Sequence, residues 1–341
     1  MIDLHLIYIA FIILIALSFD FTNGMHDAAN SIATIVSTQV LTPRWAVLWA
    51  AFFNFAAFFI FGTAVAHTVG AGMIKFDLNG TKVVTELVIF GAILAAICWN
   101  LLTWYLGLPT SSSHALIGGY AGAAIVKAGP GVIIAHGWVK TVLFIFIAPI
   151  LGMVLGGIFI FVTSRIVQKK HPAKINMWFR RLQLLSAALY SLGHGGNDAQ
   201  KTMGIISGLL FSAGITKEFH IPFWVVVAAY SAIALGTLSG GWRIVKTMGQ
   251  KITKLRPIDG FCAETASAAS IFLATHMGVP VSTTHVITGA ISGVGAAKRV
   301  TAVRWGVTLK IVWAWLFTIP GAGLMGGIFY FLANLIDKHL I

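Results

Sequence analysis

The chain has 341 residues, of which 58% are hydrophobic and only 10% are charged, and its formal net charge is +13. Soluble globular domains are about 45–50% apolar and about 25% charged, so this composition excludes an ordinary soluble domain and a disordered chain. It predicts an all-α polytopic membrane protein, in which the length allows about ten to twelve membrane segments of roughly 20 residues each.

Seven apolar runs are predicted to be membrane helices: residues 4–19, 45–66, 84–105, 140–164, 222–240, 260–276 and 308–335. The N-terminus has neither the basic region nor the small-residue cleavage site of a secretory signal, so the first run is expected to be retained. Four stretches between the runs, residues 22–38, 107–127, 193–214 and 278–297, are rich in Gly, Ser, Thr, His and Asn. Irregular backbone at membrane depth is tolerated only where protein or water satisfies it, so these stretches are predicted to be broken or re-entrant segments along a transport path.

The four stretches form two pairs of related sequences. Residues 107–114 read GLPTSSSH and residues 278–285 read GVPVSTTH, while residues 23–31 read NGMHDAANS and residues 194–202 read HGGNDAQKT. His285 and Asp198 lie the same 171 residues beyond His114 and Asp27. The chain is therefore predicted to be an internal duplication, with a first repeat at residues 1–164, a basic cytoplasmic linker at 165–181 and a second repeat at 182–341.

The basic residues indicate how the repeats are oriented. Residues 243–256 contain five Lys or Arg and residues 298–304 contain three, whereas the equivalent segments 72–85 and 127–133 contain two and one. Because positive loops remain in the cytoplasm, equivalent loops are predicted to lie on opposite sides of the membrane, as in an inverted-topology repeat. These short basic loops have no interleaved aromatic residues, so no nucleic-acid partner is expected.

Each proline-containing motif predicts a broken helix. Pro109 and Pro280 cannot continue the preceding helix, and the hydroxyl run that follows can cap a new one beginning near the histidine. A helix N-terminus is an anion site, and two such ends with added hydroxyls suit a tetrahedral oxyanion. The hydroxyls in question are Ser111, Ser112, Ser113, Ser282, Thr283 and Thr284. The competing interpretation is that they only cap helices, and His114 and His285 are candidates for anion contact, proton transfer or simple packing.

Acidic residues in apolar segments are the second candidate group. Asp27 and Asp198, with Asn30 and Asn197 beside them, offer the oxygen ligands that alkali cations prefer, or they carry protons themselves. Either case predicts coupling, because bare carboxylates repel an anion until a cation neutralises them. The alternative is a structural role for the acids, such as pairing of Asp198 with Lys201. Lys201 has Asn30 as its counterpart in the first repeat, and it is equally a candidate anion ligand or an interfacial side chain. Glu264 and Asp20 are further intramembrane acids for proton movement or structural pairing.

Several chemistries have no support in the sequence. There is no nucleotide-binding G-x-x-x-x-G-K-[ST], no H-E-x-x-H and no G-x-S-x-G, so no enzyme, metal site or cofactor is predicted. Cys98 and Cys262 lie in separate apolar runs and predict no disulfide framework.

In these motifs the sequence resembles the inorganic phosphate transporter (PiT) family, and its HGGNDAQK segment is similar to that of bacterial low-affinity phosphate permeases. The resemblance implies an inverted-repeat fold, usually a homodimer, in a bacterial-type cell membrane. It also implies import of phosphate by symport with H⁺ or Na⁺, in some members as a metal–phosphate complex. Carried over by position, phosphate contacts fall on Ser111, Ser112, Ser113, Ser282, Thr283, Thr284 and Lys201, and cation contacts on Asp27, Asn30, Asn197 and Asp198.

Three other functions are weighed against phosphate symport. Sulfate or another oxyanion is the closest alternative, but sulfate cannot donate a hydrogen bond to a carboxylate, which favours phosphate. A passive anion channel has less need of buried acids, and a membrane-embedded enzyme predicts one asymmetric site, which the duplication argues against.

Overall fold

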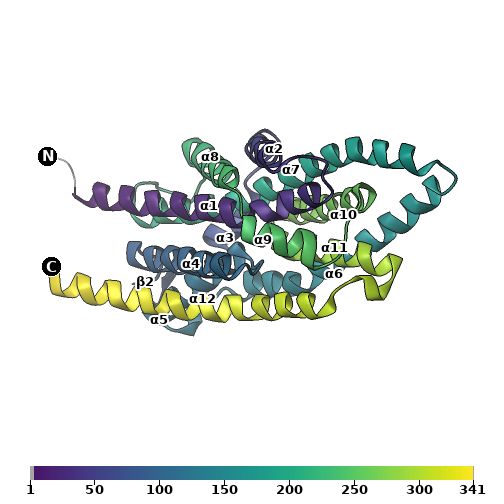
Figure 1. Cartoon of the computed structure of the whole chain (residues 1–341). Coiled ribbons are helices and arrows are strands. Elements are labelled where there is room, and N and C mark those ends of the chain that lie inside the picture. The colour runs from purple at the N-terminus through teal and green to yellow at the C-terminus, as the bar shows by residue number, and fades with distance from the viewer. Residues whose placement is uncertain (1–3, 341) are drawn as a thin grey trace.

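The structure is a computed structural model that describes residues 4–340, and it is helical almost throughout this range (Figure 1). The helices are α1 Leu4–Ser37, α2 Pro43–Ala56, α3 Ala64–Ala71, α4 Glu86–Leu106, α5 Ser112–Ala128, α6 Ala135–Val167, α7 Pro172–Ser212, α8 Phe223–Ser239, α9 Trp242–Lys246, α10 Pro257–His276, α11 Thr283–Lys298 and α12 Trp305–Leu340. A small antiparallel hairpin joins β1 Asp77–Leu78 to β2 Thr81–Lys82. Short 3₁₀ turns lie at Ala57–Phe59, Pro130–Val132 and Val300–Ala302, and a π turn at Thr247–Lys251.

Four helices are long and apolar enough to cross a membrane: α1, α4, α6 and α12. Two bent pairs bring the number of candidate spans to six, with α2 turning by 85° into α3 and α8 turning by 62° into α9. The remaining long helices, α5, α7, α10 and α11, are more polar and carry most of the buried polar side chains. The chain is thus a multi-pass membrane protein with many polar side chains buried between its helices.

Two of the four polar stretches differ from the prediction. Residues 22–38 were expected to be irregular, but α1 continues through them to Ser37, and α7 likewise runs through residues 193–214 as far as Ser212. Most of their polar side chains are buried, and some, such as Asn30 and Asn197, donate hydrogen bonds to other helices, so these side chains are accommodated in a continuous helix. Conversely, the apolar run at 45–66 does not form one helix, because it bends between α2 and α3.

The two proline motifs break the chain as predicted. α4 ends at Gly107 with φ of +66°, and α10 is followed by Gly278 with φ of +64°, a conformation that favours glycine. The next helices begin with Ser111 and Ser282 as N-caps, whose side chains accept hydrogen bonds from the backbone N–H groups of His114 and His285 at 3.2 Å.

Helices at equivalent positions pack in equivalent ways, as the predicted duplication requires. The separation of 171 residues relates α1 to α7, α4 to α10, α5 to α11 and α6 to α12. α5 packs along α12 of the other repeat, and α11 packs along α6, so each repeat completes the other. Figure 1 shows the two termini at one end of the molecule and the α6–α7 turn, with the start of α12, at the other, while the hairpin strand β2 lies toward the termini. Equivalent loops therefore face opposite ends, as an inverted repeat requires.

Glycines allow these helix pairs to approach closely. A Cβ built on Gly122 of α5 would lie 1.9 Å from the carbonyl oxygen of Gly323 on α12, and one on Gly289 of α11 would lie 2.1 Å from the carbonyl oxygen of Pro149 on α6. Both contacts are with backbone atoms, which cannot move aside as the end of a flexible side chain can. Small residues at such contacts are typical of closely packed membrane helices.

Replacing Gly122 by Leu is expected to lower the apparent unfolding temperature, because overpacking of a tight contact costs about 1–3 kcal/mol or more where backbone is in the way. Thermal unfolding of the purified protein in detergent measures the effect. Gly306→Leu is the matched control, since no heavy atom lies within 4 Å of a Cβ built on Gly306. Equal unfolding temperatures for the two variants would contradict the packing argument.

Candidate functional site

The two broken helices meet at the centre of the molecule. The rings of His114 and His285, each in the first turn of its helix, lie 4.8 Å apart between centroids. The Ser113 hydroxyl donates to the carbonyl oxygen of Val281 in the opposite break at 3.5 Å. The starts of α5 and α11 thus face each other, as the duplicated motifs predict. Two helix N-termini with hydroxyl side chains give a concentrated set of donors suited to an oxyanion.

Asp198 on α7 is held by two groups on its own helix. The Lys201 ammonium donates to Asp198 Oδ1 at 2.5 Å, and His194 Nε2 lies 3.2 Å from Asp198 Oδ2. The Thr283 hydroxyl also donates to Oδ2 at 3.3 Å. All four side chains are buried. Because an unpaired buried charge is costly, this arrangement stabilises Asp198 as a carboxylate.

Lys201 joins Asp198 to both helix breaks. Besides the carboxylate, the ammonium donates to Ser113 Oγ and to the carbonyl oxygen of Val281 at 2.9 Å. Lys201 is 1% exposed, so the interfacial alternative for this side chain is wrong.

Asp27 on α1 has a different environment from Asp198. Its Oδ1 lies 2.7 Å from His26 Nδ1 and accepts a hydrogen bond from the Thr284 hydroxyl at 3.4 Å. In place of Lys201, the first repeat has Asn30, which donates to Thr284 Oγ1 at 2.8 Å. No lysine or arginine forms an ion pair with Asp27 in the part of the chain that the structure describes. The two repeats therefore surround equivalent acids with different charges.

Asp27, His194 and Asp198 come together from the two repeats. One ligand atom from each lies within 4.8 Å of the others, and all three residues are buried. Carboxylate oxygens suit Na⁺ and divalent cations, and an imidazole nitrogen suits protons and divalent metals. This cluster is the strongest candidate for a cation site among the described residues.

The residue before each acid secures the neighbouring break. Asn197 donates to Thr275 Oγ1 at 2.8 Å and to the Val279 carbonyl at 3.1 Å, and its own oxygen accepts from the Val281 N–H at 3.3 Å. In the first repeat, His26 Nε2 lies 3.1 Å from Thr103 Oγ1 at the end of α4. Asn197 thus positions residues 279–281.

The hydroxyl residues divide into two groups. Ser111 and Ser282 cap helices, whereas Ser113, Thr283 and Thr284 make hydrogen bonds at the junction of the two breaks. Ser112 Oγ has no hydrogen-bond partner among the described residues. His285 stacks on Trp315 at 3.8 Å between centroids, and the Trp315 indole donates to the Pro109 carbonyl at 2.9 Å. Of the three candidate roles for His285, the structure therefore shows packing.

Two further acids have partners outside this cluster. Glu264 accepts hydrogen bonds from Thr34 at 2.5 Å, Gln183 at 2.9 Å and Ser186 at 2.5 Å, which ties α10 to α1 and α7. Asp20 accepts from Thr202 at 2.6 Å. These bonds support the structural interpretation of both residues.

The sequence reasoning assigned no role to His26 or His194. The signal for His194 was present, because a residue four positions before Asp198 lies on the same face of a helix. It was missed because the segment was expected to be irregular.

Comparison with known proteins places the chain among transporters. The profile described as "Phosphate transporter family" matches residues 23–326. A probable low-affinity inorganic phosphate transporter of Rhizobium meliloti is 57% identical over 95% of this chain and 96% of the relative. One of Bacillus subtilis is 46% identical over 98% of this chain and 99% of the relative. A solved structure titled "The sodium-dependent phosphate transporter" has a TM-score of 0.84 and 24% identity, covers 96% of this chain and 99% of its own, and shows the same fold.

Proposed function

The chain belongs to the phosphate transporter family, and from that premise we propose that it carries inorganic phosphate across the cell membrane by symport with a cation bound beside Asp27 and Asp198. The observation that carries the proposal is that both acids accept hydrogen bonds from hydroxyls at the start of α11, while Lys201 links Asp198 to Ser113 at the start of α5. It brings an anion site and a cation site into contact.

Phosphate binds at the junction of the two helix starts. The first N–H groups of α5 and α11 have no partner within their helices, and Ser112, Ser113, Thr283 and Thr284 add hydroxyl donors. Phosphate that keeps a proton also donates to a carboxylate, whereas sulfate has no proton to give. The acids beside the hydroxyls therefore favour phosphate over sulfate.

Coupling follows from electrostatic repulsion. A carboxylate about 4 Å from the anion repels it by roughly 4 kcal/mol at an effective dielectric constant of about 20. Lys201 already compensates the charge of Asp198, whereas His26 is the one basic side chain at ion-pair distance from Asp27 among the described residues. A cation at the Asp27–His194–Asp198 cluster removes the remaining repulsion, so phosphate binds well only after the cation.

Three cations satisfy this charge balance. Na⁺ suits the carboxylate oxygens, and the solved structure of the same fold is titled as sodium-dependent. H⁺ suits a site that includes His194, and a divalent cation carried together with phosphate suits all three ligands. The homodimer implied by the family resemblance stays a prediction.

The test is uptake of radiolabelled phosphate into liposomes that contain the purified protein, with Na⁺ and pH gradients imposed separately and excess sulfate as competitor. Uptake driven by one gradient and resistant to sulfate is the expected result, and the gradient that drives it identifies the ion. Uptake indifferent to both gradients would contradict symport and favour a channel. Inhibition by sulfate would change the substrate but not the fold.

A further inference from the structure

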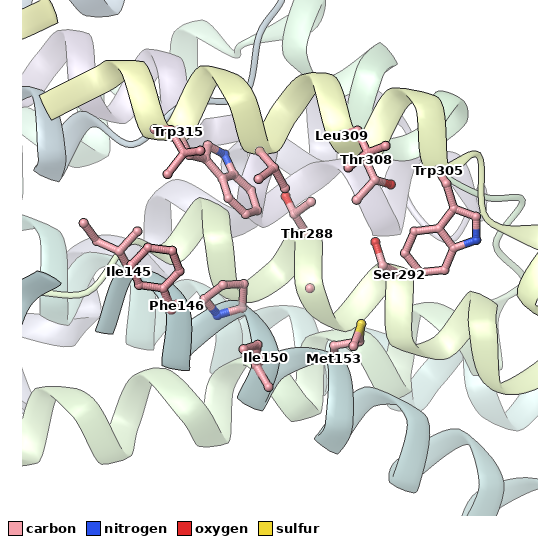
Figure 2. Close-up of a pocket in the computed structure, with 14 residues that line it drawn as sticks. Ile145, Phe146, Ile150, Met153, Thr288, Ser292, Trp305, Thr308, Leu309 and Trp315 are labelled. Carbon is pink, nitrogen blue, oxygen red and sulfur yellow. The ribbon is translucent and has the colours of Figure 1, made fainter. Parts of the chain in front are cut away.

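A groove on the outside of the molecule lies between α6, α11 and α12 (Figure 2). Its volume is about 270 Å³, and its wall is almost entirely apolar. Phe146, Ile150 and Leu309 line it and are more than half exposed, which in a membrane protein means exposed to lipid. Trp305 lies at one end of the groove and Trp315 at the other. A lipid chain therefore has direct access to it.

Three hydroxyls interrupt the apolar wall. Thr288 and Ser292 on α11 and Thr308 on α12 line the groove, and none of their hydroxyl oxygens has a hydrogen-bond partner among the described residues (Figure 2). Thr288 and Ser292 are only 1% and 2% exposed. Elsewhere in these helices, Thr141 and Thr318 donate to the carbonyl one turn back. A buried hydroxyl without a partner is costly, so these three point to a ligand with oxygen acceptors.

The duplication shows that the fold itself does not need these hydroxyls. The equivalent positions in the first repeat are Ile117, Ala121 and Gly137, all apolar. α5 with Ile117 and Ala121 packs along α12 as α11 packs along α6. The hydroxyls are thus a special property of the second repeat.

The end of the groove at Trp305 is positively charged. Trp305 begins α12 directly after the basic segment 298–304. Lys298 pairs with Asp259, but Arg299 and Arg304 are exposed and have no carboxylate partner in the part of the chain that the structure describes. Because short basic loops are cytoplasmic, this end faces the leaflet in which anionic lipids attract Lys and Arg.

We propose that this groove binds an anionic glycerophospholipid. One acyl chain packs along Phe146, Ile150 and Trp315, and the ester oxygens accept hydrogen bonds from the three hydroxyls. The phosphate group lies at the end marked by Trp305, within the field of Arg299 and Arg304. The occupant packs against Trp315, which stacks on His285 and donates to the Pro109 carbonyl, so it supports both helix breaks.

Native mass spectrometry of the full-length protein in detergent tests this proposal, with titration of phosphatidylglycerol and of phosphatidylcholine with the same chains. The protein is expected to bind phosphatidylglycerol more tightly. Removing Arg299 and Arg304 as Gln variants is expected to reduce that preference by about fivefold for each arginine. The exposed pair Lys75 and Lys82, also changed to Gln, is the matched control and is expected to keep it, because both lie in or beside the β1–β2 hairpin, toward the opposite end of the molecule (Figure 1).

The triple variant Thr288→Val, Ser292→Ala, Thr308→Val tests the hydroxyls. It is expected to weaken binding of both lipids without lowering the unfolding temperature, because the hydroxyls removed have no hydrogen-bond partners among residues 4–340. Equal binding of both lipids, unchanged by any variant, would overturn the proposal. A shift in the monomer–dimer ratio of the triple variant with unchanged lipid binding would also overturn it and assign the groove to a second copy of the chain. Lipid binding and unfolding temperature are both measured without transport, so failure of the lipid proposal and failure of the proposed phosphate transport can be told apart.

Discussion

Replacing Asp27 by Asn is expected to abolish gradient-driven accumulation of phosphate while leaving exchange of phosphate across the liposome membrane largely intact. Of the two equivalent acids, Asp198 has an ammonium partner and Asp27 has none among the described residues, so the charge of Asp27 is the one that the coupling cation neutralises. The variant imitates the neutralised state permanently. Removing a repulsion of roughly 4 kcal/mol removes a coupling of several hundredfold between the cation and phosphate.

The measurement compares net uptake driven by a cation gradient with exchange of labelled for unlabelled phosphate at equal concentrations. Asp77→Asn is the matched control, because Asp77 lies exposed in the β1–β2 hairpin and bonds only locally to the Gly80 N–H at 3.0 Å. That variant is expected to behave like the unchanged protein in both assays. Accumulation by Asp27→Asn that still follows the cation gradient would show that Asp27 does not couple the two fluxes.

The architecture was predictable because its determinants are local and occur twice. Proline after an apolar helix, followed by Ser111 or Ser282 as a cap, dictates a break wherever it occurs, and the constant separation of 171 residues reveals the duplication. The continuous helix through residues 22–38 was not predictable in the same way. Asp20 and Asn30 are tolerated in α1 because their partners Thr202 and Thr284 come from distant segments.

The candidate site was predictable only in its individual parts. Each motif identifies an acid or a hydroxyl run, but the cluster of Asp27 with His194 and Asp198 combines two repeats and depends on how they dock. The same holds for Asn197, which resembles a cation ligand in sequence but is occupied in holding residues 279–281. The bend between α2 and α3 has no proline at its centre and so no clear local signal.

Replacing Lys201 by Asn is expected to make transport require an additional cation for each phosphate. The variant gives the second repeat the same residue as the first, where Asn30 accompanies Asp27. Asp198 then loses its ammonium partner and regains a charge that a mobile cation must neutralise. Reversal potentials of phosphate flux in liposomes, measured with defined cation and phosphate gradients, report the ratio of the two fluxes.

Direct binding of phosphate by Lys201 predicts a different result from replacement of a cation by its ammonium. If the ammonium binds phosphate directly, Lys201→Asn weakens phosphate affinity at every cation concentration. If the ammonium takes the place of a cation, a higher concentration of the coupling cation restores uptake. The phosphate concentration for half-maximal uptake, measured at low and high cation concentration, distinguishes the two.

Folding of the charge variants provides the last control. Asp198→Asn alone leaves a buried ammonium without its carboxylate, which is expected to destabilise the protein by about 3–5 kcal/mol. Adding Lys201→Asn removes the unpaired charge, so the double variant is expected to recover most of the lost unfolding temperature. Recovery of stability without recovery of gradient-driven uptake would show that the pair stabilises the fold and that Asp198 also contributes to coupling. If the double variant is no more stable than Asp198→Asn, the ammonium is not held by Asp198, and its role as a built-in cation at this site is wrong.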